Sequence, residues 1–154
     1  RNLMKRTFFP LLLACLLPLA VAAQEVTGLT VLKSSHDVAT TTDKLIAAVE
    51  AKGLKIFARI DHAAGAEKAG LTLAPTELVL FGDPKLGTTL MHCSHTIAID
   101  LPLKALVWQD PDGAVWLGYN APDYLAERHG IEGCGKPLAK VSGALAKFAA
   151  AATE

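Results

Sequence analysis

A predicted β-hairpin constrains the fold of this chain more than any other feature. Residues 104–109 and 114–120 are two segments rich in β-branched and aromatic residues, as strands are. They are separated by Asp110, Pro111, Asp112 and Gly113, the residue types of a tight hairpin turn. Strands joined by so short a turn run antiparallel, so the sequence predicts an antiparallel pair in the sheet.

The region before the hairpin predicts a strand, a helix and a second strand. Residues 25–33 are typical of a strand, and Asp37 is suited to cap a helix that runs to about Lys52. Gly53 follows where a left-handed residue commonly ends a helix. The strand expected over 54–61 has one apolar face, with Leu54, Ile56, Ala58 and Ile60. Its other face is mixed, with Lys55, Phe57, Arg59 and Asp61.

The remaining segments complete an α+β fold. We expect a short helix over 62–70, a third strand over 76–81, and a helix that Pro84 starts and that ends near His95. The last of these helices would bury a stripe of Leu86, Leu90 and Met91. A helix over 122–129, an irregular loop and a C-terminal helix over 138–152 follow. The strands alternate apolar and polar residues, which argues against a sheet buried on both faces. The prediction is a largely antiparallel sheet of about five strands, with helices mainly on one face.

The first twenty-three residues have the three parts of a secretory signal peptide. Met4, the expected start, precedes two basic residues, an apolar run over 8–20 and a small-residue cleavage site. We expect cleavage after Ala22 or Ala23. This leaves a single domain over 24–154 that works in the periplasm or outside the cell.

Charge and hydropathy argue against two kinds of partner. The 154 residues hold 15 basic and 15 acidic side chains, and loss of the signal region leaves 12 and 15. A mature chain with a net charge near −3 and scattered charges has no basic face for nucleic acid. It also has no second apolar segment of the length that spans a bilayer.

Two cysteines remain in the mature chain, because Cys15 lies in the signal region. Cys93 and Cys134 are a candidate disulfide in an oxidising compartment. The bridge would close about 42 residues and contribute on the order of 3 to 4 kcal/mol. Two separate thiols and shared metal ligation are the alternatives. A faint likeness to a lipidation box makes lipid attachment at Cys15 a weaker alternative to cleavage by the ordinary route.

The segment His92-Cys93-Ser94-His95 has side chains that bind metals. His92 and His95 are three residues apart, so they share a face on a helix, and Cys93 adds a sulfur ligand. Imidazole and sulfur suit copper or zinc, and an exported protein meets both. The alternative is an exposed polar helix end, with Cys93 buried or disulfide-bonded.

Three further residues are candidates for binding a small ligand. His62 follows a predicted strand and opens a turn of small residues, where a ligand can approach closely. Asp100 and Tyr119, together with His129, are polar residues expected near a cleft. Structural roles are the alternatives: a capping histidine, a turn aspartate and a core tyrosine.

Several ordered blocks of the chain resemble the family called domain of unknown function 302. They are FARIDH from Phe57, PTELVLFGDPKLGTTLM from Pro75, DLPLKALVWQD from Asp100, and the pairs Tyr119-Asn120 and Tyr124-Leu125. The resemblance covers nearly the whole mature chain. It implies a compact α+β domain, often exported in bacteria, that forms a homodimer in some cases. It implies no activity and no catalytic residue. The segment 92–95 departs from the family pattern, which has small or amide residues there.

These observations lead to three functional expectations. The first is a non-enzymatic exported domain that binds a small ligand or a protein, without a cofactor. The second is an exported copper- or zinc-binding protein that uses His92, Cys93 and His95. The third is a small hydrolase or redox enzyme that uses His62 or Cys93. The sequence has no nucleophile–base–acid set, phosphate loop or dinucleotide motif, which lowers the expectation of an enzyme.

Overall fold

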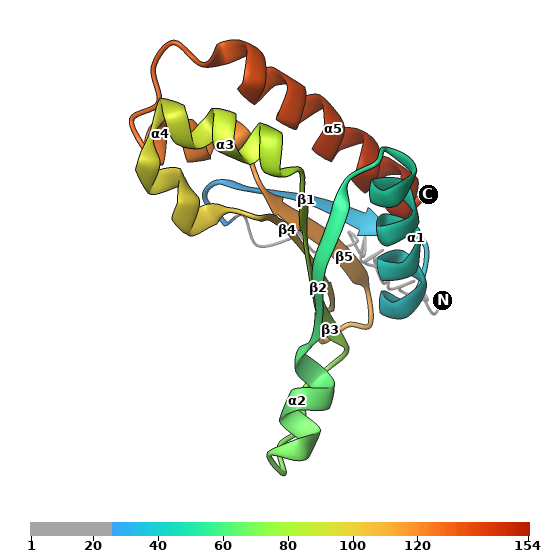
Figure 1. Cartoon of the computed structure of the whole chain (residues 1–154). Helices are drawn as coiled ribbons and strands as arrows, with labels where there is room; N and C mark the ends of the chain where they lie inside the picture. The colour runs from blue at the N-terminus through green and yellow to red at the C-terminus, as the bar shows by residue number, and fades with distance from the viewer. Residues whose placement is uncertain (1–25) are drawn as a thin grey trace, which may run out of the picture.

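A five-stranded antiparallel sheet forms the centre of the molecule (Figure 1). The computed structural model describes residues 26–154, so the predicted signal region, with Met4, Cys15 and the cleavage site, lies outside the described residues. The strands are β1 (Leu29–Ser34), β2 (Lys55–Asp61), β3 (Thr76–Gly82), β4 (Leu103–Gln109) and β5 (Val115–Asn120). Their order is β1-β5-β4-β3-β2, and every neighbouring pair is antiparallel. The predicted α+β class is confirmed.

The helices lie between the strands in the chain and after them. They are α1 (Val38–Ala51), α2 (His62–Lys68), α3 (Pro84–Cys93), the 3₁₀ helix η1 (His95–Asp100), α4 (Pro122–Arg128) and α5 (Gly135–Thr153). The long helices α1 and α5 pack against each other and against one face of the sheet (Figure 1). The main apolar core lies between these helices and the strands, and there the Phe81 ring meets the Phe148 ring edge-on at 6.1 Å.

The β4–β5 hairpin is held by the aspartate that begins its turn. The Asp110 Oδ1 atom accepts hydrogen bonds from the backbone N–H groups of Asp112 at 3.0 Å and Ala114 at 2.8 Å. The Oδ2 atom accepts one from the indole N–H of Trp116 at 2.7 Å. Gly113 has a φ of +84°, a left-handed conformation that favours glycine. The hairpin predicted from the sequence is therefore confirmed.

The caps of α1 follow the sequence prediction as well. The Asp37 carboxylate accepts a hydrogen bond from the backbone N–H of Thr40 at 2.7 Å, which satisfies one of the free donors in the first turn. Gly53, with a φ of +75°, follows the last turn. The strand-helix-strand order at the start of the chain is confirmed.

The C-terminal helix begins earlier than the sequence predicted. α5 starts at Gly135, whereas the prediction placed its start at Leu138. Pro137 is tolerated because it lies in the first turn, where its backbone nitrogen needs no hydrogen bond. Residues 95–100, for which no separate helix was expected, form η1.

A β-bulge in β2 makes the predicted single apolar face of that strand wrong. Ile56 lies opposite Phe81 and faces the core, but the register shifts between Ile56 and Ala58. The extra residue moves every later side chain to the other face, so Ala58 points away from the helices. Arg59 consequently faces the covered side, where its Nε donates to Glu77 at 2.6 Å. This hydrogen bond raises the pKa of the Arg59 guanidinium.

The face of the sheet opposite the core is also apolar at its centre. The strand register places Val31, Leu78, Leu106, Trp108 and Trp116 on this side, and all five are half-buried. None of them belongs to the main core formed within residues 26–154. We call these five residues the open face.

The segment 62–75 projects from one end of the sheet. It contains α2 and the connection to β3, and it extends away from the rest of the molecule (Figure 1). We call it the α2 arm. Leu71 and Leu73 in this arm are 67% and 48% exposed. The arm therefore presents apolar side chains to solvent beyond the edge of the sheet.

Candidate functional site

The helix α3 forms one wall of the candidate site, and its start is fixed by two adjacent residues. The Asp83 carboxylate accepts a hydrogen bond from the backbone N–H of Leu86 at 2.8 Å, and Pro84 occupies the first turn. The helix consequently begins directly after β3. Leu90 is buried against the core, whereas Leu86 and Met91 are only partly covered. Part of the predicted buried stripe therefore faces a space that protein atoms do not fill.

That space is an apolar cavity of about 350 Å³. It lies between α3, the chain from Ala98 to Leu103, and Phe57 at the bulge of β2. Asp83 is its one charged lining residue, and that carboxylate already caps α3. The hydroxyl of Thr88, another lining residue, donates to the Pro84 carbonyl at 2.8 Å. Each of these two polar side chains makes a hydrogen bond within the protein, and the cavity offers mainly apolar surface.

Gly87 lies in the middle of α3 and also lines this cavity. A methyl group placed there would meet only the Leu101 side chain, at an ordinary distance of 3.8 Å. The Leu101–Pro102 peptide bond, which is cis, is part of the opposite wall. The absence of a side chain at Gly87 therefore leaves volume in the cavity. No close contact with the backbone requires a glycine at this position.

Close to this wall, a polar network joins η1 to the end of α4. His129 Nε2 lies 2.6 Å from Asp100 Oδ2, and His129 Nδ1 lies 2.9 Å from Thr96 Oγ1. Ser94 Oγ donates to the His129 carbonyl at 3.0 Å, and Arg128 Nε lies 3.6 Å from the same Asp100 oxygen. The His129 side chain is only 5% exposed. Because the imidazole has so little access to solvent, this network holds two segments together and does not present a base to a substrate.

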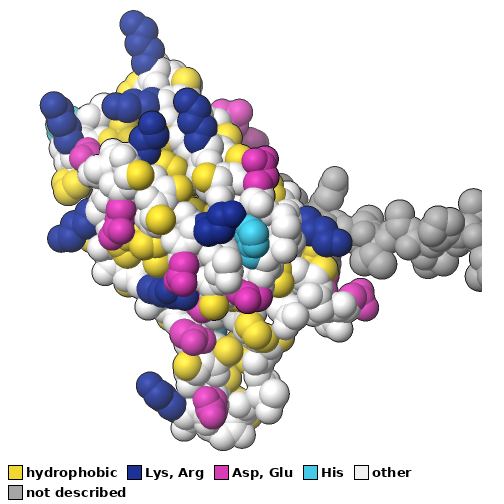
Figure 2. Space-filling view, turned by 90° about the vertical axis from the view of Figure 1, so that its right-hand side faces the viewer, with side chains coloured by type: hydrophobic (Ala, Val, Ile, Leu, Met, Phe, Trp, Pro, Cys, Tyr) yellow, Lys and Arg dark blue, Asp and Glu magenta, His cyan; other side chains and the backbone are white. Residues whose placement is uncertain are grey.

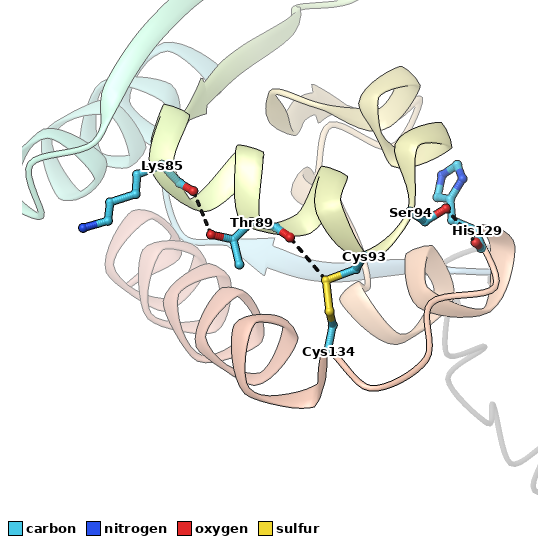
Figure 3. The surroundings of a disulfide bond; sticks show 6 residues. All are labelled: Lys85, Thr89, Cys93, Ser94, His129 and Cys134. Atoms are coloured by element: carbon cyan, nitrogen blue, oxygen red, sulfur yellow. Dashed lines mark hydrogen bonds between the residues drawn. A yellow bond between two sulfur atoms is a disulfide. The ribbon is translucent and has the colours of Figure 1, made fainter.

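The end of α3 is bonded covalently to the residue before α5. Cys93 and Cys134 form a disulfide, with their Cα atoms 6.3 Å apart (Figure 3). Of the alternatives that the sequence left open, the structure therefore has the disulfide. Ser94, the residue after Cys93, is hydrogen-bonded to His129 (Figure 3). The disulfide and the polar network are therefore neighbours in the structure.

The proposed metal ligands lie around this disulfide. His92 and His95 are exposed, and the sulfur atom of Cys93 is bonded to Cys134. Within residues 26–154, no three side chains of His, Cys, Asp or Glu are grouped as a metal ion requires. Copper or zinc binding at this segment stays a prediction, and metal analysis of untagged protein tests it.

The three predicted ligand-binding residues lie in different parts of the fold. His62 is the first residue of α2 and is exposed, and the Asp61 carboxylate caps that helix by accepting from Ala64 at 2.8 Å. Asp100 is buried near the start of β4, at the opposite end of the sheet. Tyr119 is buried in β5, where burial raises the pKa of its hydroxyl. The structure does not bring these three side chains together.

The cavity residues are those that sequence reasoning missed. Phe57 was expected to lie on the mixed face of a regular strand, and the bulge that redirects it has no evident sequence signal. The stripe of Leu86, Leu90 and Met91 was identified, but as core.

The fold and the cavity define a small α+β domain with an apolar cavity beside one helix. The chain belongs to the DUF302 family, described as "Domain of unknown function DUF302", which matches residues 30–150. A crystal structure of an uncharacterized conserved DUF302 protein from Bacillus stearothermophilus has the same fold, with a TM-score of 0.73. That likeness covers 82% of this chain and 99% of the other at 16% identity, so it shows the fold alone.

Part of the chain is also similar to longer curated proteins. It is 48% identical over 104 residues to "Fluoride-specific ion channel FluC 1" of Brucella suis and to the protein of that name from Brucella abortus. The match covers 68% of this chain but only 41% and 38% of those proteins. The chain thus spans about two fifths of the relatives it matches. Among residues 26–154, no helix has the length and apolar character needed to cross a membrane.

Proposed function

We propose that this protein is an exported binding domain that takes a small apolar molecule into the cavity beside α3. The observation that carries the proposal is the cavity itself, with a volume of about 350 Å³ and an almost wholly apolar lining. Small-molecule sites are typically concave, apolar and of this size. Because the cavity has few free polar groups, we expect binding to depend on apolar contact area and shape.

Two features support the exported location. The first twenty-three residues have the composition of a signal peptide. The disulfide between Cys93 and Cys134 is of a kind that persists in oxidising compartments and is rare in the cytosol. We expect the protein recovered from the periplasm or the medium to begin after Ala22 or Ala23, which mass spectrometry of the intact chain measures.

Binding is tested with the neutral fluorescent probe N-phenylnaphthylamine. We expect saturable binding of one probe per chain and at least a roughly tenfold weaker affinity in Gly87→Leu, whose side chain would occupy the cavity. Gly65→Leu is the matched control, because Gly65 lies in α2, outside the cavity, with no atom within 4 Å of an added methyl group. Equal affinity in wild type and Gly87→Leu would show that the probe binds elsewhere and would overturn the proposal.

The similarity to fluoride-specific ion channels does not make fluoride a ligand of this cavity. Those longer proteins are named fluoride-specific ion channels, and this chain matches about two fifths of their length. A hydrated anion needs hydrogen-bond donors, and the cavity lining is apolar. We therefore expect fluoride neither to bind in the cavity nor to displace the probe.

The open face supports a second function, binding of another copy of this chain. Five strands about 4.8 Å apart and six residues long present roughly 500 Å² per copy. Two such faces would bury about 1,000 Å² in total, near the lower limit for specific protein interfaces. We therefore propose a homodimer that forms through the open face and dissociates on dilution. Ile60 in β2, opposite Leu78 of the open face and 39% exposed, extends the apolar surface at one corner.

A further inference from the structure

A second groove lies next to the apolar cavity and has a different character. Its volume is about 530 Å³, and its walls come from the end of α1, the start of α3 and the middle of α5. Asp83 and Leu86 line both spaces, which places the first turn of α3 between them. We call this second space the lysine groove.

Four lysines line the lysine groove. They are Lys52 after α1, Lys85 in α3, and Lys140 and Lys147 in α5. Lys140 and Lys147 are seven residues apart, so they lie on the same side of α5. Figure 3 shows Lys85 extending from α3 on the side where α5 lies. Figure 2 shows basic side chains gathered over apolar atoms on the upper part of the molecule.

Within residues 26–154, the lining of the groove has four basic side chains and one acidic one. Asp83 is the one acidic residue in its lining, and that carboxylate is already hydrogen-bonded to the backbone N–H of Leu86 at 2.8 Å. The ion pairs formed within residues 26–154 involve Arg59, Arg128 and His129, and none of the four lysines. Like charges held around one groove repel one another, so a bound anion lowers their free energy.

The lining of the groove also has an apolar part. It includes Leu54, Leu86 and Phe148 beside the four lysines. Gly143 lies halfway between Lys140 and Lys147, and a methyl group added there would have no atom within 4 Å. The groove is therefore open above α5 and has both an apolar surface and cationic groups around it. A simple inorganic anion would contact only the cationic groups.

We propose that the lysine groove binds an anionic amphiphile, a molecule with an apolar chain and a carboxylate or phosphate head. The chain lies on Leu54, Leu86 and Phe148, and the head is bound by the lysine ammonium groups. The groove volume is within the range of small-molecule sites. This site is separate from the apolar cavity, so its ligand and the neutral ligand proposed above do not compete directly.

The test uses octanoate, with octanol as the neutral molecule of the same chain length. Titration into the isotopically labelled protein, followed by NMR of the backbone amides, measures affinity and location together. We expect octanoate to shift amides in α5 around Gly143 and to bind at least about tenfold more tightly than octanol. We expect Lys140→Gln/Lys147→Gln to lose about tenfold or more of this affinity. Lys68→Gln/Lys104→Gln, which removes two lysines outside the groove, is the matched control.

The source of the head group is decided with vesicles of phosphatidylcholine that contain phosphatidylglycerol. Both possible results support the proposal. Binding of octanoate indicates a free amphiphile, and lysine-dependent sedimentation with the vesicles indicates a lipid. Equal affinity for octanoate and octanol, or no effect of Lys140→Gln/Lys147→Gln on either ligand, overturns it. Loss of octanoate binding in Gly87→Leu also overturns it, because the ligand would then lie in the apolar cavity. Retention of N-phenylnaphthylamine binding in the double lysine variant keeps the two proposals distinguishable.

Discussion

At the scale of single residues, Asp110 links the stability of the hairpin to pH. Its carboxylate accepts hydrogen bonds from the Trp116 indole and from two backbone N–H groups of the turn. The hydrogen bond from Trp116, followed by those from the turn, holds the pKa of Asp110 below its ordinary value of 3.8. Since the folded state favours the ionised form, the contribution of Asp110 is fully present above pH 3.8. It is lost as the pH falls through the lowered pKa.

Asp110→Asn removes this charge but keeps an oxygen that accepts from the turn. We expect the variant to be less stable than wild type at pH 7 and the difference to shrink at pH values below 3.8. Urea denaturation at pH 7 and pH 3 measures both free energies of unfolding. Asp112→Asn is the control, because Asp112 contributes its backbone N–H to the same turn. A difference between wild type and Asp110→Asn that is the same at both pH values would contradict this assignment.

At the scale of elements, the disulfide joins two helices that otherwise meet through few residues. It bonds the last residue of α3 to the residue before α5, across 41 positions of the chain. A covalent link of this span restricts the unfolded chain far more than the folded one. The segments on either side, η1 and the loop before α5, are consequently held near each other without a large apolar interface.

We expect Cys93→Ser/Cys134→Ser to lower the free energy of unfolding by on the order of 3 kcal/mol. Urea denaturation measures this loss, and reduction of the wild type with a phosphine should reproduce it while leaving the double variant unchanged. Neither cysteine lines the apolar cavity, so N-phenylnaphthylamine binding by the folded variant should persist. Two titratable thiols in denatured, unreduced wild type would show that the bridge does not form.

The elements also show why sequence reasoning succeeds in some places. The hairpin and the caps of α1 depend on residues close together in the chain, such as Asp110 with Ala114, or Asp37 with Thr40. Local patterns of this kind are readable. The cavity is different, because Phe57, Met91 and Leu101 come from three separate segments and meet only in the folded chain. Asp100 and His129 were both predicted as polar candidates. Their contact was not predicted, because β4 and β5 separate them in the chain.

At the scale of the whole molecule, association through the open face is the main prediction. We expect sedimentation velocity to give the mass of two chains at about 100 μM and a mixture at lower concentration, as a small interface requires. Leu106→Lys places a charge at the centre of the open face and should give the mass of one chain.

Ile99→Lys is the matched control for this prediction. Ile99 is 73% exposed in η1, away from the strands, so a lysine there adds the same charge without touching the open face. Wild type that sediments as one chain at about 100 μM would contradict the dimer. So would an equal loss of mass in both variants, because the effect would then come from charge alone.

The bulge in β2 has a consequence for how copies of this chain avoid unwanted contact. β2 is the last strand of the sheet on one side, and an edge strand offers its unpaired backbone groups to any other extended chain. The bulge interrupts the regular spacing of those groups, and the exposed Lys55 places a charge beside it. A strand added there would meet an irregular, charged template, so growth of the sheet into fibrils is disfavoured. The same bulge that places Phe57 at the cavity thus disfavours aggregation through this edge.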